Sequence, residues 1–386
     1  MVVNAALKKI GIISGLGLFV FLSGCAAISQ KDELIPMFWP DPPEKTRIKY
    51  VQSFRSRDDV GGPSVLEVVV GRTPQAALRQ PMGVTISEDG KRIYVADFAW
   101  SAVFVFDFKA RETRIIGDQE RHPLGEPVGV ALDVSENVYV TDSRTRSVRV
   151  YDKNGNFLKS IGKDLLVRPT GVAVDKKRQR LYVVDTGHND ERAHQVKVFD
   201  LEGKLIREIG RRGKGDGEFN FPTFATVDTE GRLYVVDSAN FRVQVFDQDG
   251  KFLRKFGRSG DKVGDFARPK AVALDSFGNV YVVDSMWSNI QIFNQKGELL
   301  LNFGGVGTYP GLLLNPAAIT IDKENTIYIS DTFGRRISIY QLVNTTAEES
   351  WETQEANTKG GENNTEDKKL VASKVAEVKT KGGENK

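Results

Sequence analysis

The chain has 386 residues, of which 40% are hydrophobic and 27% are charged, so it can bury the core of one large domain or of two ordinary ones. Its 54 basic and 51 acidic residues nearly balance, and no dense Lys/Arg stripe occurs, which argues against a nucleic-acid-binding surface. A single cysteine excludes an intrachain disulfide and a cysteine-rich metal site.

The N-terminus has the pattern of a secretory signal. Lys8 and Lys9 precede a mostly apolar run over 10–22, which is shorter than the roughly 20 residues of a membrane span but typical of a signal peptide. The run closes with LSGC, which resembles a bacterial lipobox. The resemblance implies that a signal peptidase removes 1–24 and that Cys25 carries a lipid. An ordinary signal peptide with a chance cysteine is the alternative.

The expected lipid would hold the protein at the cell envelope, since each buried methylene contributes roughly 0.8 kcal/mol and two or more chains anchor stably. Ala26 follows the cysteine. An aspartate at this position would resemble the inner-membrane retention signal of Gram-negative lipoproteins, so its absence favours the outer membrane if the host is Gram-negative. Residues 25–46 are predicted to be a lipidated tether, stiffened by four prolines. Trp39 is expected either in this tether or docked on the domain that follows.

Between 79 and 343 the sequence repeats itself. A five-residue apolar motif ending in aspartate, such as LYVVD, recurs at intervals of 43 to 52 residues, a spacing typical of repeat architectures. The six motif aspartates are Asp97, Asp142, Asp185, Asp237, Asp284 and Asp331.

Each unit contains the pattern of four short strands. An apolar strand introduced by proline precedes the motif, and an alternating strand, a polar turn and a fourth strand follow it. Four antiparallel strands repeated radially make a β-propeller blade. The sixth unit lacks a fourth strand, and RIKYVQSF at 47–54 resembles the missing piece. We therefore predict an all-β, six-bladed β-propeller over 47–343, with its ring closed by this N-terminal strand.

Two segments fit no blade. Residues 57–78 are predicted to form a loop or a short helix over one face. Residues 344–386 are polar and twice contain TKGGEN, so they are predicted to be a disordered tail.

The blade pattern resembles a known repeat. Pro-x-Gly-Val-Ala-Val-Asp, then Leu-Tyr-Val-Val-Asp, then Arg-Val-x-Val-Phe is similar to the NHL repeat, and 221–257 is the closest copy. The lipobox, tether and six units together resemble bacterial six-bladed NHL-repeat lipoproteins. The resemblance implies NHL-type blades and a cell-envelope location, and it implies little about activity.

One face of the predicted propeller carries the longer connections. The loops between strands two and three and the connections between blades share that face, and they are longer and more varied than the hairpin turns opposite. Five blades have five residues after the motif aspartate, whereas blade three has ten, TGHNDERAHQ. Binding is expected on this face.

Metal chemistry is the main alternative to binding. Some related propellers are lyases whose zinc is held by three histidines, and His194 faintly resembles one such ligand, with His122 and His188 as further weak candidates. Solvated loop histidines are the competing interpretation. Lactonase-type propellers hold a divalent metal at the channel, but an aspartate in every blade favours a structural role. This alternative would use zinc or calcium; the binding hypothesis needs no cofactor.

Aromatic and arginine side chains on the loop-rich face are the types enriched at interaction hot spots. The candidates are Trp100, Arg144, Arg146, His188, Arg192, His194, Phe241, Arg242, Trp287, Phe333 and Arg335. The leading hypothesis is a lipid-anchored envelope scaffold that binds a protein or peptide through this face, without nucleic acid. The main alternative is an envelope hydrolase or lyase with a divalent metal at the channel. Carbohydrate binding is a third hypothesis.

Overall fold

The computed structural model describes residues 37–61, 77–118, 121–187 and 194–345. Cys25, His188, Arg192 and almost the whole predicted tail lie outside these ranges. In the described part, no helix is long and apolar enough to cross a membrane.

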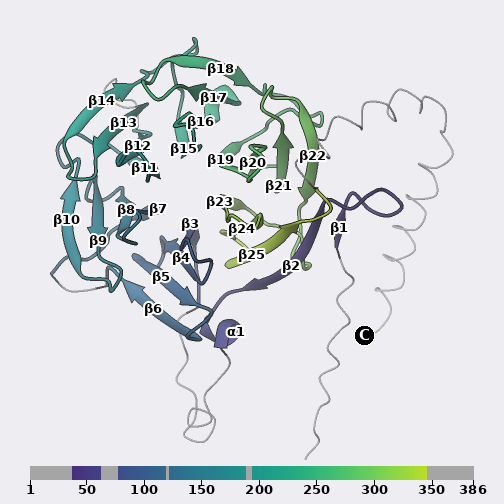
Figure 1. Cartoon of the computed structure of the whole chain (residues 1–386), viewed down its shortest axis with the longest axis horizontal. Helices are drawn as coiled ribbons and strands as arrows, with labels where there is room; N and C mark the ends of the chain where they lie inside the picture. The colour runs from purple at the N-terminus through teal and green to yellow at the C-terminus, as the bar shows by residue number, and fades with distance from the viewer. Residues whose placement is uncertain (1–36, 62–76, 119–120, 188–193, 346–386) are drawn as a thin grey trace, which may run out of the picture. The chain divides into compact units, whose positions relative to one another are not determined.

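Six antiparallel sheets form a ring in which the first strand of each sheet lies nearest the centre (Figure 1). Five sheets contain four consecutive strands, and the sixth joins the two ends of the described chain. This is the predicted all-β, six-bladed propeller.

Blades 1 to 3 follow one another along the chain. Blade 1 comprises β3 (Pro81–Ile86), β4 (Arg92–Asp97), β5 (Ala102–Asp107) and β6 (Glu112–Ile116). Blade 2 comprises β7 (Pro127–Leu132), β8 (Val138–Asp142), β9 (Ser147–Tyr151) and β10 (Phe157–Ile161). Blade 3 comprises β11 (Pro169–Asp175), β12 (Arg180–Asp185), β13 (Gln195–Asp200) and β14 (Leu205–Ile209).

Blades 4 to 6 complete the ring. Blade 4 comprises β15 (Pro222–Val227), β16 (Leu233–Asp237), β17 (Arg242–Phe246) and β18 (Phe252–Phe256), with the short 3-10 helix η1 (Ser238–Asn240) in its loop. Blade 5 comprises β19 (Pro269–Leu274), β20 (Val280–Asp284), β21 (Asn289–Phe293) and β22 (Leu299–Gly304). Blade 6 comprises β23 (Pro316–Ile321), β24 (Thr326–Asp331), β25 (Arg336–Leu342) and the N-terminal strands β2 (Ile48–Phe54) and β1 (Phe38–Trp39).

The position of a strand within its blade explains its residue pattern. The second strand is covered by neighbouring blades on both sides, so all five residues of LYVVD in β16 are buried. The outer strand β18 alternates between partly buried and exposed residues until Phe256. Continuous apolar runs therefore mark inner strands, and alternation marks outer ones.

The ring is closed by the N-terminal strand, as predicted. β2 pairs with β25 from Ile48 opposite Leu342 to Phe54 opposite Ile337. β1 then pairs with β2, and the Trp39 ring lies 5.8 Å from the ring of Tyr340. The end of the expected tether, from residue 37 onward, is thus docked on the propeller.

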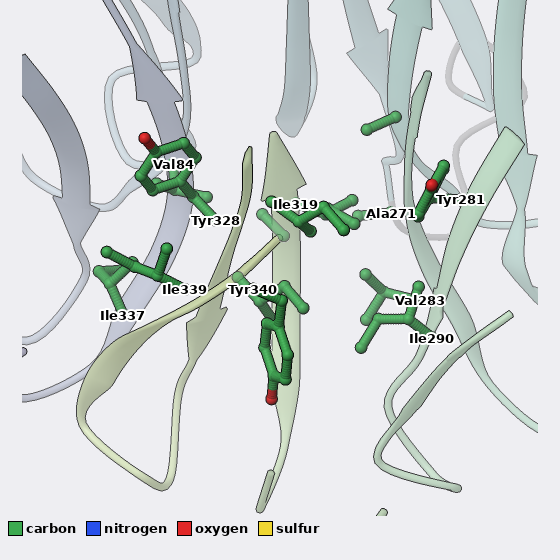
Figure 2. Close-up of a cluster of buried hydrophobic side chains, with 14 of the residues drawn as sticks. Val84, Ala271, Tyr281, Val283, Ile290, Ile319, Tyr328, Ile337, Ile339 and Tyr340 are labelled. Carbon is green, nitrogen blue, oxygen red and sulfur yellow. The ribbon is translucent and has the colours of Figure 1, made fainter. Parts of the chain in front are cut away.

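The junction between the chain ends is a hydrophobic cluster shared by blades 5, 6 and 1. Figure 2 shows buried side chains from all three, among them Tyr281, Ile319 and Val84. Burial of this surface favours closure, at roughly 25 cal/mol per Å² of apolar area.

The inner strands approach one another closely. A Cβ on Gly129 would lie 2.5 Å from the Thr170 carbonyl oxygen of the next blade, and one on Gly171 would lie 2.6 Å from the Thr223 oxygen. Glycine in the Pro-x-Gly motif is therefore required by backbone contact between blades. Outside the blades, α1 (Arg57–Gly61) is a short helix at the start of 57–78, the segment expected to be a loop or a short helix; residues 62–76 lie outside the described ranges.

Candidate functional site

The six motif aspartates are structural. All six are fully buried at the ends of the second strands. The carboxylate of Asp284 accepts hydrogen bonds from the backbone N–H groups of Ala267 (2.7 Å) and Arg268 (3.1 Å), which enter the blade, and of Met286 (3.0 Å), in the next loop. Each aspartate accepts backbone N–H groups in this way. They hold the loops of one face in place and are not presented to a ligand.

That face carries the long connections between blades. Those over 211–221, 258–268 and 305–315 share one shape, each closed by a short parallel bridge such as Val306 with Leu313. The Gly305 N–H donates to the Ser288 carbonyl (2.9 Å), and the Arg336 guanidinium donates to the Thr308 carbonyl (3.2 Å). The connection 305–315 is therefore fastened to the loops of both blade 5 and blade 6.

Exposed apolar side chains occur on three adjacent loops: the connection 305–315 and the loops that follow Asp284 in blade 5 and Asp331 in blade 6. They are each 40% to 68% exposed: Met286, Trp287, Val306, Tyr309 and Phe333, called here the blade 5–6 patch. Three of the four exposed aromatic side chains among the described residues belong to it, and the fourth, Phe277, lies in a hairpin turn of the opposite face. The patch includes two of the sequence candidates, Trp287 and Phe333.

The other two candidate aromatics are packing residues. The Trp100 indole N–H donates to the Ala77 carbonyl (2.8 Å), and the Arg79 guanidinium lies 4.0 Å above its ring. Phe241 is partly buried against the cluster between blades 4 and 5. Their rings are engaged within the propeller.

The candidate arginines divide in the same way. Arg144, Arg146 and Arg335 are exposed on the loops of blades 2 and 6. Arg242 is buried and its Nε donates to the carboxylate of Asp237 at 2.8 Å. The expectation that Arg242 faces a partner is wrong, because its charge neutralises a buried aspartate.

The histidines show a similar correction. His194 is fully buried, and its Nδ1 accepts a hydrogen bond from the Phe221 N–H (3.2 Å) in the neighbouring blade. It is neither a solvated loop residue nor part of a binding surface. His122 is exposed and stacks on Phe157 with ring centroids 4.2 Å apart. His188 and Arg192 lie outside the described residues.

The channel mouth on the loop-rich face is a cavity of about 520 Å³. Three cationic side chains line it, Arg168, Arg268 and Lys270, with one acid, Glu126. Lys270 is partly buried whereas both arginines are exposed, and desolvation of Lys270 together with the charge of Arg268 lowers the pKa of its amine to about 8. The mouth is therefore electropositive.

This lining does not fit a divalent metal. Zinc and calcium need several histidine, thiolate or carboxylate ligands, whereas the mouth offers one carboxylate beside three cations. No group of three such ligands occurs anywhere in the part of the chain that the structure describes.

The sequence candidates did not include the channel-lining cations or three of the five patch residues, Met286, Val306 and Tyr309. The signal for Lys270 was available: the residue after the first-strand proline is Met82, Val128, Thr170, Thr223, Lys270 or Ala317 in the six blades. Lys270 is the one charged residue at a position that is uncharged in the other five blades, which marks it as unusual. Tyr309 and Val306 gave no such signal, because the exposure of a loop residue depends on its neighbours in space.

Comparison with known families finds three matches along the chain. Residues 72–187 match the SMP-30/gluconolactonase/LRE-like region, 219–246 match the NHL repeat and 274–358 match a six-bladed β-propeller family. The chain is 28% identical over 117 residues to "Protein brain tumor" of Drosophila melanogaster and 28% identical over 166 residues to "NHL repeat-containing protein 2" of Bos taurus. These regions cover 29% and 34% of this chain, and the chain spans only 10% and 22% of those relatives.

Solved structures share the fold at low identity. A protein of unknown function from Bacteroides thetaiotaomicron has a TM-score of 0.56 at 17% identity, covering 77% of this chain and 76% of its own. A streptogramin B lyase gives 0.52 at 13%, covering 69% and 94%, and an auxiliary nutrient binding protein from Bacteroides ovatus gives 0.53 at 13%, covering 68% and 69%. Both a lyase and a binding protein are thus built on this architecture, so the site has to decide the function.

Proposed function

We propose that this chain, a six-bladed β-propeller with NHL-type blades, is a lipid-anchored cell-envelope scaffold that binds a protein or peptide partner. The observation that carries the proposal is the blade 5–6 patch. Monomeric proteins rarely leave aromatic side chains grouped on adjacent loops, and such groups mark interaction surfaces.

The composition and rigidity of the patch favour a protein partner. Tryptophan, tyrosine, phenylalanine and methionine are enriched at interface centres, and Arg335 at the edge supplies an exposed cation. Its loops are fixed by the buried carboxylates of Asp284 and Asp331, so binding costs little ordering entropy.

The membrane anchor is the second part of the proposal. It is supported by the apolar run over 10–22 and the LSGC sequence that ends at Cys25. The lipid would place the patch at the envelope, with the outer membrane as the expected location in a Gram-negative host.

Site-specific photocrosslinking tests the patch. The photoreactive amino acid p-benzoylphenylalanine replaces Phe333 in one variant and Phe277, on the opposite face of blade 5, in a matched control. After irradiation of intact cells, we expect a discrete crosslinked band from position 333 and none from 277. The proposal is overturned if both positions give the same products, or if position 333 gives none while the protein is folded and present.

The alternative, an envelope hydrolase or lyase with a channel metal, is favoured by the match of 72–187 to the gluconolactonase-like region but opposed by the cationic lining of the channel mouth. Elemental analysis of the purified protein separates the two. One tightly bound zinc or calcium per chain supports the enzyme, and its absence after purification without chelator supports the scaffold.

A further inference from the structure

The channel mouth collects positive charge by its position in the ring. The residue before each first-strand proline stands at the rim, and in blades 3 and 5 it is Arg168 and Arg268. Lys270 follows the proline of β19, one step further into the channel. Arginines from two blades and a lysine thus converge on one cavity.

These charges have no acidic partner among the described residues. Neither arginine nor Lys270 makes an ion pair there, although fifteen other lysines and arginines do. Glu126, the single acid of the lining, has its carboxylate 3.6 Å from the guanidinium of Arg144. The cavity therefore keeps a net positive charge, and at Lys270, the only one of the three cations that is not exposed, no counter-ion offsets the cost of desolvation.

The rest of the wall suits an organic molecule. Phe98, Phe221 and Phe224 line the same cavity and are all partly exposed. Ser143 and Ser238 add hydroxyl groups to the wall. Ligand sites in proteins combine an apolar wall with a few convergent polar groups in this way, at volumes of roughly 300–1,000 Å³.

We propose that the channel mouth is a binding site for a small organic carboxylate with an aromatic or apolar body. Lys270 and Arg268 hold the carboxylate by charge-assisted hydrogen bonds, and the three phenylalanines contact the body. The site is separate from the blade 5–6 patch, so it goes beyond partner binding. The carboxylate could belong to a free acid or to the C-terminus of a peptide, which share this chemistry.

Calorimetry on the purified protein tests the site with two probes. 3-Phenylpropionate represents a free acid, N-acetyl-glycyl-phenylalanine represents a peptide end, and the uncharged 3-phenylpropionamide is the control. We expect at least one acid to bind with a dissociation constant of about 1 mM or less, and the amide to bind at least about 10-fold more weakly. Whichever acid binds more tightly identifies the source of the carboxylate.

Matched lysine variants locate the binding. Lys270→Met should weaken acid binding by about 10-fold or more, because it removes the charge. Lys176→Met, at the opposite end of the channel, should leave the affinity unchanged. Trp287→Ala in the patch should also leave it unchanged, which separates this site from the proposed partner surface.

Chemical modification tests the site without a variant. At pH 7.5 the bound acid should protect Lys270 from acetylation, as measured by mass spectrometry, and should not protect Lys176. The proposal is overturned if neither acid binds at about 10 mM. Equal weakening by Lys270→Met and Lys176→Met, or acetylation of Lys270 at an unchanged rate with acid present, also overturns it.

Discussion

Arg335 and Arg336 are neighbours in the chain but belong to different environments. Arg335 is exposed, whereas Arg336 is buried, with its Nε 3.2 Å from a carboxylate oxygen of Asp331. Its guanidinium also donates to the carbonyls of Thr308 and Leu312. Arg242 makes the corresponding contacts in blade 4. At the scale of the residue, an arginine here is either an interior brace or part of the surface.

Replacing each arginine separates these roles. Arg336→Ala should lower the free energy of unfolding by about 3 kcal/mol or more, because it leaves Asp331 buried without its cation. Arg335→Ala should change it by less than about 0.5 kcal/mol. Urea unfolding of both variants measures the difference, and equal effects would contradict the assignment of Arg336 as a brace.

Lys270 makes the stability of the folded protein rise with pH. Its folded pKa of about 8 lies below the ordinary 10.5, so the unfolded chain binds more protons between these values and stability rises with pH there. Arg268, Arg168 and Glu126 are the other charged groups that face the same cavity. The free energy of unfolding of the wild type should therefore rise between pH 7.5 and pH 10, and Lys270→Met should reduce that rise by about 1–2 kcal/mol.

Urea unfolding at both pH values measures that rise in the wild type and the variant. The titration of the other groups cancels in the comparison. The same substitution should not destabilise the protein at pH 7.5, because it removes a desolvated charge. An unchanged pH dependence would contradict the burial of the amine.

At the scale of the element, the loops between strands two and three share one backbone feature. The last residue before strand three has a positive φ in all six blades, from 50° to 63°. These residues are Ser101, Arg146, His194, Phe241, Ser288 and Arg335. His194 thus occupies a position common to every blade, and the extra residues of blade 3 precede it.

This distinction predicts unequal effects for two changes in blade 3. Deletion of 188–192 should keep the free energy of unfolding within about 1 kcal/mol of the wild type, because loop length changes closure entropy only slowly. His194→Ala should cost about 2 kcal/mol, since it creates a cavity and leaves the Phe221 N–H without its acceptor. Thermal and urea unfolding compare the two; a larger cost for the deletion would contradict this view of the loop.

At the scale of the whole molecule, stability depends on joining residues almost 300 positions apart. β2 completes blade 6, and its end residues Ile48 and Phe54 are buried. Without β2, the outer edge of β25 and the hydrophobic cluster of Figure 2 would be exposed.

Truncation measures the contribution of closure. A chain beginning at residue 56 should unfold at a much lower temperature and aggregate, because an unpaired edge strand remains. A chain beginning at residue 37 should keep the wild-type unfolding temperature, since it retains β1 and β2. Calorimetry and size-exclusion chromatography provide the comparison, and a stable monomer from the shorter chain would contradict closure by β2.

The membrane anchor also concerns the whole molecule. If the proposed lipidation is right, Cys25→Ala should abolish incorporation of labelled palmitate and move the protein from the membrane fraction to the soluble fraction, because the acyl chains proposed on Cys25 would supply the anchoring free energy. Ser23→Ala, which keeps the cysteine, serves as the control. Labelling that persists in Cys25→Ala would refute lipidation at this residue.

The sequence by itself determined the fold because the propeller repeats one local pattern six times. Each unit contains the same LYVVD-type strand, proline and hairpin turn, so each predicts the same blade. Because the sixth unit lacks a fourth strand, the similar segment 47–54 was expected to supply it. The sequence also indicated the structural role of Asp284 and its equivalents, because a residue that recurs in all six blades is expected to stabilise the fold of each blade.

Only the tertiary structure decided which loop residues face outward. Arg335 and Arg336, or Trp100 and Trp287, cannot be distinguished by type or spacing, because burial depends on the connection that packs beside each loop. The contact of the connection that carries Tyr309 with the loop that carries Phe333, and the shared cavity of Arg168 and Lys270, likewise join different blades. Local pattern fixes a blade, whereas a site made between blades exists only once the ring has closed.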